Sequence, residues 1–153
     1  MKALELKVPP PVVALVLALA MWAVSRLTPT FDVGAPLRIA VAIAIALVGG
    51  AFSAAGMTAF RRAKTTMNPM KPETSSSLVT TGIYRVTRNP MYVGLLFVLV
   101  GWMAFLGAPW TLAGPAVFVA YVTRFQIAPE ERVLMSAFGD VYASYKARVR
   151  RWL

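Results

Sequence analysis

The chain has 153 residues, of which 58% are hydrophobic and 14% charged, with 16 Lys and Arg against 6 Asp and Glu. Soluble domains are about 45–50% apolar, so this composition predicts one integral membrane domain over residues 1–153. The chain has no cysteine and no histidine, which excludes disulfides, thiolate catalysis and the commonest metal ligands, and no metal is expected. The basic residues lie between the apolar runs, where they set membrane orientation, so membrane lipids rather than nucleic acid are the expected partners.

Two apolar runs near the N-terminus are each long enough to cross a bilayer. The first, residues 8–25, follows two lysines as a signal peptide would, but it has the length of a retained transmembrane helix. The second covers residues 37–60. Small residues inside it would let helices pack closely in lipid: Gly49, Gly50, Ser53 and Gly56.

A third apolar run, residues 91–122, contains no charged residue. It is too long for one span of about 20 residues and short for two. Gly107 and Pro109 interrupt it, which predicts two short or tilted helices over residues 91–107 and 109–125, joined by a tight turn.

Polar segments flank this predicted hairpin. Residues 61–90 form the longest predicted loop, and residues 126–153 form a basic tail. In the tail, Pro129 is expected to start an amphipathic helix that lies at the membrane surface, with a kink at Gly139.

The predicted fold is therefore an all-α integral membrane protein with about four transmembrane helices, including a C-terminal hairpin, and a cytoplasmic amphipathic C-terminal helix. Four spans place the N-terminus, the central loop and the C-terminus on one side. The excess of Lys and Arg predicts that this side is cytoplasmic.

Polar residues at the two feet of the hairpin could carry chemistry, and each also has a structural explanation. Asn89 and Pro90 suit the N-cap and first position of a helix, or that helix N-terminus could bind an anion together with Arg88. Glu130 and Glu131 could complement a helix macrodipole, or could hold a ribose hydroxyl or a cation.

Two further groups have the same ambiguity. Arg124 and Gln126 could anchor the chain at the interface or could orient a substrate head group. Four tyrosines are expected at the interface, where aromatic rings are common, or could form part of an aromatic cage around a cation: Tyr84, Tyr92, Tyr142 and Tyr145.

These residues form a recognisable pattern. It reads Gly82-x-Tyr84-Arg85-x-x-Arg88-Asn89-Pro90-x-Tyr92, then Glu130-Glu131, then Phe138-Gly139-x-x-Tyr142-x-x-Tyr145. Over about residues 65–153 it resembles the isoprenylcysteine carboxyl methyltransferase family, which is related to the membrane phospholipid methyltransferases. Many members of that family have Arg-His-Pro at the position of Arg88-Asn89-Pro90, so a role that needs imidazole proton chemistry is not expected here.

The resemblance implies a multi-span helical methyltransferase that uses S-adenosylmethionine, with a cofactor pocket built from the central loop, the hairpin and the tail. It implies these cofactor-binding residues: Tyr84, Arg88, Asn89, Pro90, Tyr92, Glu130 and Glu131. Arg124 and Gln126 are assigned to the substrate side, and Arg124 and Glu131 to catalysis.

The expected reaction is methyl transfer at the membrane–cytoplasm interface to a lipophilic small molecule or lipid that enters from the bilayer. A carboxylate, an amine or a thiol acceptor is compatible with the sequence. Two alternatives remain open, a nicotinamide-dependent membrane reductase and a non-enzymatic membrane binding or scaffold protein. The sequence does not indicate an oligomeric state.

Overall fold

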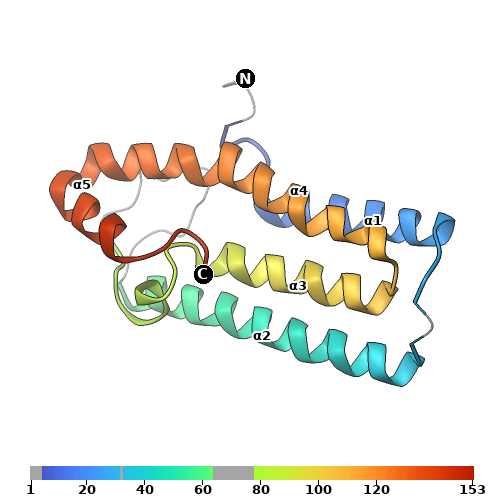
Figure 1. Cartoon of the computed structure of the whole chain (residues 1–153). Helices are drawn as coiled ribbons and strands as arrows, with labels where there is room; N and C mark the ends of the chain where they lie inside the picture. Colours follow the sequence, from blue (N-terminus) through green and yellow to red (C-terminus); the bar gives the residue numbers. More distant parts are fainter. Residues whose placement is uncertain (1–4, 32, 64–77) are drawn as a thin grey trace.

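The computed structural model describes residues 5–31, 33–63 and 78–153, and the regular elements in these ranges are helices (Figure 1). In chain order they are α1 (Pro10–Leu27), α2 (Ala35–Arg62), the 3-10 helix η3 (Gly82–Arg85), α3 (Pro90–Leu106), the 3-10 helix η4 (Pro109–Leu112), α4 (Ala113–Val122), the π-helical segment η5 (Thr123–Ile127) and α5 (Ala128–Arg148). Helices α1 to α4 pack side by side, and α5 continues beyond one end of this bundle (Figure 1).

The turn predicted within the third apolar run is confirmed. Helix α3 ends at Leu106, and Gly107 follows in the left-handed conformation with φ 64°, which a glycine adopts without steric cost. Pro109 then begins η4 and the chain reverses into α4. The hairpin brings the start of α3 and the end of α4 to the same end of the bundle.

Close contact between α2 and α3 depends on small residues, as the sequence predicted. A Cβ atom added at Gly49 would lie 2.6 Å from the Gly94 carbonyl oxygen, and one added at Gly56 would lie 3.1 Å from the Pro90 side chain. Gly50, one residue further along α2, faces open space instead. The backbones therefore approach too closely for a side chain at Gly49, and a side chain at Gly56 would press on Pro90.

Helices α1 and α2 are long and apolar enough to cross a membrane, and α3 is a shorter apolar helix. Most of the apolar surface of α1 and α2 is not covered by protein. Leu15 on α1 is 61% exposed and Leu47 on α2 is 69% exposed. A soluble core helix would bury such residues, whereas a bilayer solvates them, so the structure supports a membrane protein.

Pro129 lies in the first turn of α5, as the sequence predicted, but α5 continues directly from η5 rather than standing as a separate helix. The chain keeps helical geometry from α4 through η5 into α5. Proline lacks the N–H that would reach the Phe125 carbonyl one turn earlier, and the wider π turn directly precedes it. The Leu6 amide of the N-terminal segment donates to this Phe125 oxygen at 3.0 Å instead, so the carbonyl stays satisfied.

The predicted kink at Gly139 is confirmed. Gly139 has φ 49° and ψ −127°, a backbone conformation that favours glycine, and it divides α5 into two arms. The second arm turns back toward the bundle end (Figure 1) and buries Tyr142 and Tyr145. Whether α5 lies at a membrane surface stays a prediction.

We expect Gly94→Ala to destabilise the protein, because its Cβ would lie 2.0 Å from Ser53 Oγ and 2.6 Å from the Gly49 carbonyl oxygen. Overpacking of this kind costs about 1–3 kcal/mol. Thermal unfolding in detergent should show a lower midpoint for Gly94→Ala and no loss for Gly50→Ala, the matched control. Equal midpoints for the two variants would contradict the close α2–α3 contact.

Candidate functional site

The polar residues singled out in the sequence meet at one end of the bundle. There η3 and the start of α3 face the η5–α5 region, and the C-terminal residues after α5 return between them (Figure 1). Two adjacent carboxylates on α5, Glu130 and Glu131, lie in this region, and each is surrounded by its own set of partners.

Glu131 is held by three cations, a set that we call the Glu131 cluster. Arg151 makes two bonds to it, Nε to Oε1 at 2.9 Å and Nη2 to Oε2 at 2.7 Å. Arg88 Nη2 donates to Oε1 at 2.7 Å, and Lys146 Nζ lies 3.6 Å from Oε2. Bidentate guanidinium–carboxylate pairs of this kind combine charge with fixed geometry. The cluster thereby joins the start of α3 to α5 and to the C-terminal residues.

The charge environment keeps Glu131 ionised. Burial on its own raises the pKa of this carboxyl group. The hydrogen bonds from Arg151 and the positive charges of Arg88, Arg151 and Lys146 act in the opposite direction and prevail, so the pKa lies below its ordinary value of 4.5. A carboxylate with this many cationic partners is already neutralised by the protein itself.

The C-terminal residues are fixed by backbone contacts as well. Thr87 and Arg150 form a parallel bridge, and the Arg88 amide donates to the Arg150 carbonyl oxygen at 3.0 Å. Asn89 Nδ2 donates to the Arg151 carbonyl oxygen at 2.9 Å. Trp152 Nε1 donates to Thr123 Oγ1 at 3.1 Å, which connects this segment to η5.

The role predicted for Asn89 and Pro90 is therefore only half right. Asn89 occupies the N-cap position and Pro90 the first turn of α3, but the Asn89 side chain makes no capping hydrogen bond. Its amide group holds the C-terminal segment instead, and its backbone N–H is satisfied by Thr87 Oγ1 at 3.2 Å. An asparagine can serve here because its amide nitrogen is a good donor to a carbonyl oxygen.

Glu130 belongs to a second set, the Glu130 cluster, with Tyr92 and Gln126. Tyr92 Oη donates to Glu130 Oε1 at 2.6 Å, and Gln126 Nε2 donates to the same oxygen at 2.8 Å. The structure thus brings together three residues that the sequence placed in the site, one from α3, one from η5 and one from α5. None of the ion pairs among the described residues includes Glu130.

Burial without a cation makes Glu130 a weak acid. Desolvation raises its pKa to about 7, and the negative charge of Glu131 acts in the same direction. The hydrogen bonds from Tyr92 and Gln126 favour the ionised form but only partly offset the burial. This carboxyl group therefore changes charge close to neutral pH, unlike its neighbour.

The four tyrosines are buried rather than exposed at the interface, so the prediction of interfacial aromatics is wrong. Tyr145 Oη donates to the Tyr84 carbonyl oxygen at 2.8 Å, which ties α5 to η3. Burial raises the pKa of Tyr84 and of Tyr145, and it raises the pKa of Tyr142 to about 12. These rings remain neutral at physiological pH and line the region around the two glutamates.

Arg124 lies apart from both clusters. Its side chain is 44% exposed and its Nη1 pairs with Glu5 Oε1 at 3.0 Å, while Arg132 pairs with the other oxygen of Glu5. Gln126, two residues further on, faces Glu130. Arg124 and Gln126, the two residues assigned to the substrate side, thus do not lie in one site: Arg124 faces Glu5, and Gln126 faces Glu130.

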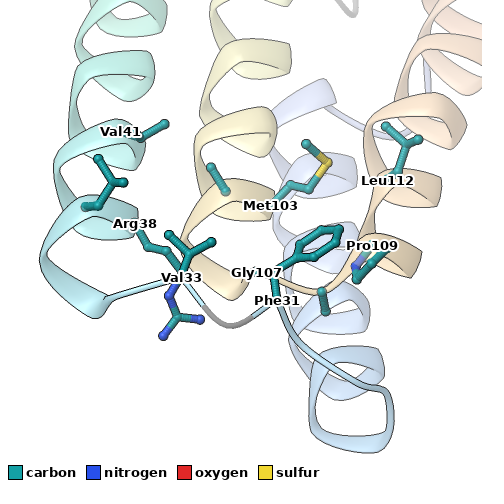
Figure 2. A pocket seen from close by; sticks show the side chains of 11 residues that line it. Phe31, Val33, Arg38, Val41, Met103, Gly107, Pro109 and Leu112 are labelled. Atoms are coloured by element: carbon teal, nitrogen blue, oxygen red, sulfur yellow. The ribbon is translucent and has the colours of Figure 1, made fainter.

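A pocket of about 490 Å³ lies at the opposite end of the bundle and contains none of the predicted site residues (Figure 2). Its lining is apolar except for Arg38 among the described residues. A Cβ atom at Gly107 would come 2.8 Å from Arg38 Nη1, so the arginine lies against the C-terminal end of α3. There its charge complements the helix dipole, which accounts for the residue structurally.

The sequence analysis missed the residues after α5 and before α1. Arg151 and Trp152 make contacts that define the site, and Glu5 pairs with Arg124 and Arg132 away from it, yet nothing in the local sequence pattern of these three residues indicated their contacts. Three arginines within four residues, 148–151, were interpreted only as basic character. The one available signal was the scarcity of acids, because a glutamate such as Glu131 needs a cationic partner if it is buried in so basic a chain.

Comparisons with known proteins agree with the sequence pattern. A family model described as phospholipid methyltransferase matches residues 37–141, more than half of the chain. A Bradyrhizobium diazoefficiens protein named methanethiol S-methyltransferase 1 is 40% identical over 70 residues, which is 44% of this chain and 22% of that protein. The Schizosaccharomyces pombe protein-S-isoprenylcysteine O-methyltransferase is 36% identical over 75 residues, 47% of this chain and 30% of that protein.

A Haemophilus influenzae protein described as uncharacterized is 46% identical over 63 residues, 41% of this chain and all of that protein. The chain spans less than half the length of the methyltransferases it matches. The family match includes Tyr92 and both glutamates but ends before Arg151. Of the three cationic partners of Glu131, Arg88 therefore lies inside the matched segment, whereas Lys146 and Arg151 lie outside it.

We expect Glu131→Gln to destabilise the protein at pH 7, because it leaves buried Arg88 without its counter-charge. Removing one partner of a buried ion pair costs about 3–5 kcal/mol. Thermal unfolding should show a clearly lower midpoint for this variant. Glu5→Gln, which affects only exposed pairs, is the control and should leave the midpoint unchanged. Matching midpoints for both variants would contradict the structural role of the cluster.

We expect Glu130→Gln to stabilise the ligand-free protein above neutral pH. Folding raises the pKa of the Glu130 carboxyl group from 4.5 to about 7. The protonated group therefore stabilises the folded state fully at a pH below 4.5, the pKa in the unfolded state, and this stabilisation is lost as the pH rises through the folded-state pKa. Glutamine keeps both hydrogen-bond donors satisfied and does not titrate. The difference in unfolding free energy should widen between about pH 4.5 and 7, reach on the order of 3 kcal/mol, and stay level above. A pH-independent difference would contradict a buried, uncompensated Glu130.

Proposed function

The chain belongs to the phospholipid methyltransferase family, and we propose that it transfers a methyl group from S-adenosylmethionine to a lipophilic acceptor at a membrane surface. The names of its relatives refer to methanethiol and to a prenylated cysteine, so the acceptor is expected to be a small lipophilic molecule or a lipid. A carboxylate, an amine and a thiol all remain candidates for the accepting group.

One observation carries the proposal, the Glu130 cluster. Three helical elements bring Tyr92, Gln126 and Glu130 together at a bundle end, inside the segment that the family model matches. Polar groups held this way beside an apolar bundle are typical of a site that orients a ligand. The cluster has two fixed donors and a carboxylate to which the described residues bring no cation.

The residues present fit S-adenosylmethionine. This cofactor carries positive charge at its sulfonium and ammonium groups, and a largely buried carboxylate without a cation is a suitable partner for either. Neutral tyrosine rings around the glutamates, such as Tyr84 and Tyr142, suit a cationic ligand as well. When bound, the cofactor supplies an electrophilic methyl group, and no metal is needed for that chemistry.

The protein's own contribution would be positioning. Displacement at a methyl carbon needs donor and acceptor in line, and fixing their orientation can supply much of the rate. Glu130, Tyr92 and Gln126 would hold the donor. The Glu131 cluster would contribute indirectly, by positioning the residues that hold the donor. It fixes the start of α3, which carries Tyr92, against α5, which carries Glu130.

The orientation in the membrane is part of the proposal. Basic residues gather at the end of the bundle that carries the two glutamates, among them Arg61, Arg62, Arg85, Arg132 and Lys146. Arg26 and Arg38 lie toward the other end. This bias supports four crossings with the site, the N-terminus and the C-terminus on the cytoplasmic side.

Calorimetric titration of the detergent-purified protein tests the cofactor. S-adenosylhomocysteine should bind saturably, whereas a reduced nicotinamide dinucleotide should not. Binding of the nicotinamide alone would favour a membrane reductase. Binding of neither to folded protein would favour a non-enzymatic membrane protein.

Tyr92→Phe should weaken S-adenosylmethionine binding about tenfold, because a hydrogen bond to a charged group contributes about 1.5 kcal/mol. Arg124→Gln is the matched control and should leave cofactor affinity unchanged, since Arg124 faces Glu5. Equal affinity for the cofactor in wild type and Tyr92→Phe would show that the Tyr92 hydroxyl group does not contribute to cofactor binding.

A further inference from the structure

The two adjacent glutamates differ in the number of cations that surround them, and this difference bears on the methyl-transfer chemistry. Three cations lie within 4 Å of Glu131, at 2.7, 2.7 and 3.6 Å, but the described residues offer none to Glu130. Tyr92 and Gln126, both neutral, donate to its Oε1, and its Oε2 accepts no hydrogen bond from the described part of the chain. Within the described part of the chain, Glu130 therefore has one oxygen without a hydrogen bond and no cationic partner.

We propose, on the basis of the proposed function, that the Glu130 carboxylate is the counter-ion of the positively charged methyl donor. The site would thereby distinguish the charged donor from the product. In the reaction the S–CH3 bond breaks, its electron pair stays on sulfur, and the methyl carbon bonds to the acceptor. The sulfonium charge disappears, while the adenosine, carboxylate and ammonium groups are the same in donor and product. A site that retains one and releases the other must sense the charge or the methyl group.

The surroundings of Glu130 leave this role open to a ligand. Its titratable neighbours are Tyr92 on α3, Tyr84 on η3, and Glu131 and Tyr142 on α5. The tyrosines are neutral and Glu131 is negative, so none of them can stabilise an ionised Glu130 as a cation would. A sulfonium near this carboxylate would therefore gain an attraction that no cation among residues 5–31, 33–63 and 78–153 already supplies.

A change of protonation follows from this arrangement. With a pKa of about 7, Glu130 is mostly protonated at pH 6 in the free protein. A cationic donor favours the ionised form, so its binding releases the proton to solvent. Once the charge has been lost, the carboxylate regains a proton from solvent and the attraction for the product ends.

Titration calorimetry of the full chain can count these protons, with S-adenosylmethionine and S-adenosylhomocysteine as probes. Each is titrated at pH 6 and pH 8, in two buffers that differ in ionisation enthalpy. We expect the donor to release about 0.9 proton at pH 6 and to bind about tenfold more tightly at pH 8. The product should release less than half as much and change its affinity less than about threefold.

Two variants assign the effect to the carboxylate. Glu130→Gln keeps the shape without the charge, so proton release should vanish and the affinity of the donor should no longer depend on pH. Tyr92→Phe removes a neighbouring hydroxyl but keeps the carboxylate, so proton release should persist. The wild-type comparison of donor and product stands without either variant, should one of them fail to fold.

Failure of this inference can be told apart from failure of the proposed function. If both probes bind with equal proton release, or if Glu130→Gln keeps the wild-type preference for the donor, Glu130 is not the counter-ion, although the cofactor assignment stands. If neither probe binds to folded wild-type protein, the proposed function and this inference are both overturned.

Discussion

Glu131 and its three cations are the interaction on which the site depends. The carboxylate draws Arg88 from the start of α3 and Arg151 from the C-terminal segment to one point on α5. Burying the charges of Glu131 and Arg88 is costly, and only pairing with good geometry offsets that cost. The cluster fixes α3 and α5 relative to one another, although no regular hydrogen bonding connects these two helices. Tyr92 and Glu130 can then meet at 2.6 Å.

Adjacent residues on a helix point in directions about 100° apart, and here that geometry separates two functions. One carboxylate is directed into a cationic cluster, which holds its pKa below the ordinary value and favours its ionised form. The next is directed toward neutral donors and titrates near neutrality. The protein thereby keeps a structural acid and a ligand-responsive acid side by side without mixing their charge environments.

Much of the fold could be predicted from the sequence, because length, apolar runs and turn residues are local signals. The hairpin turn at Gly107, the kink at Gly139 and the close contact at Gly49 all follow from such signals. The site could be predicted as a set of residues but not as an arrangement. The ties to Arg151 and Glu5 cross distances in sequence that no periodicity encodes. The continuity of the helix at Pro129 depended on an amide from the other end of the chain.

The π-helical segment has a consequence for how this chain can vary. Successive residues of an α-helix are rotated by about 100° about the helix axis. The π turn of Thr123–Ile127 contains one residue more than an α turn would. Deleting one residue there would restore a regular helix and rotate everything after it, so that Glu130 would no longer face Tyr92. Substitutions between α4 and α5 should therefore be tolerated in evolution far more readily than changes in length.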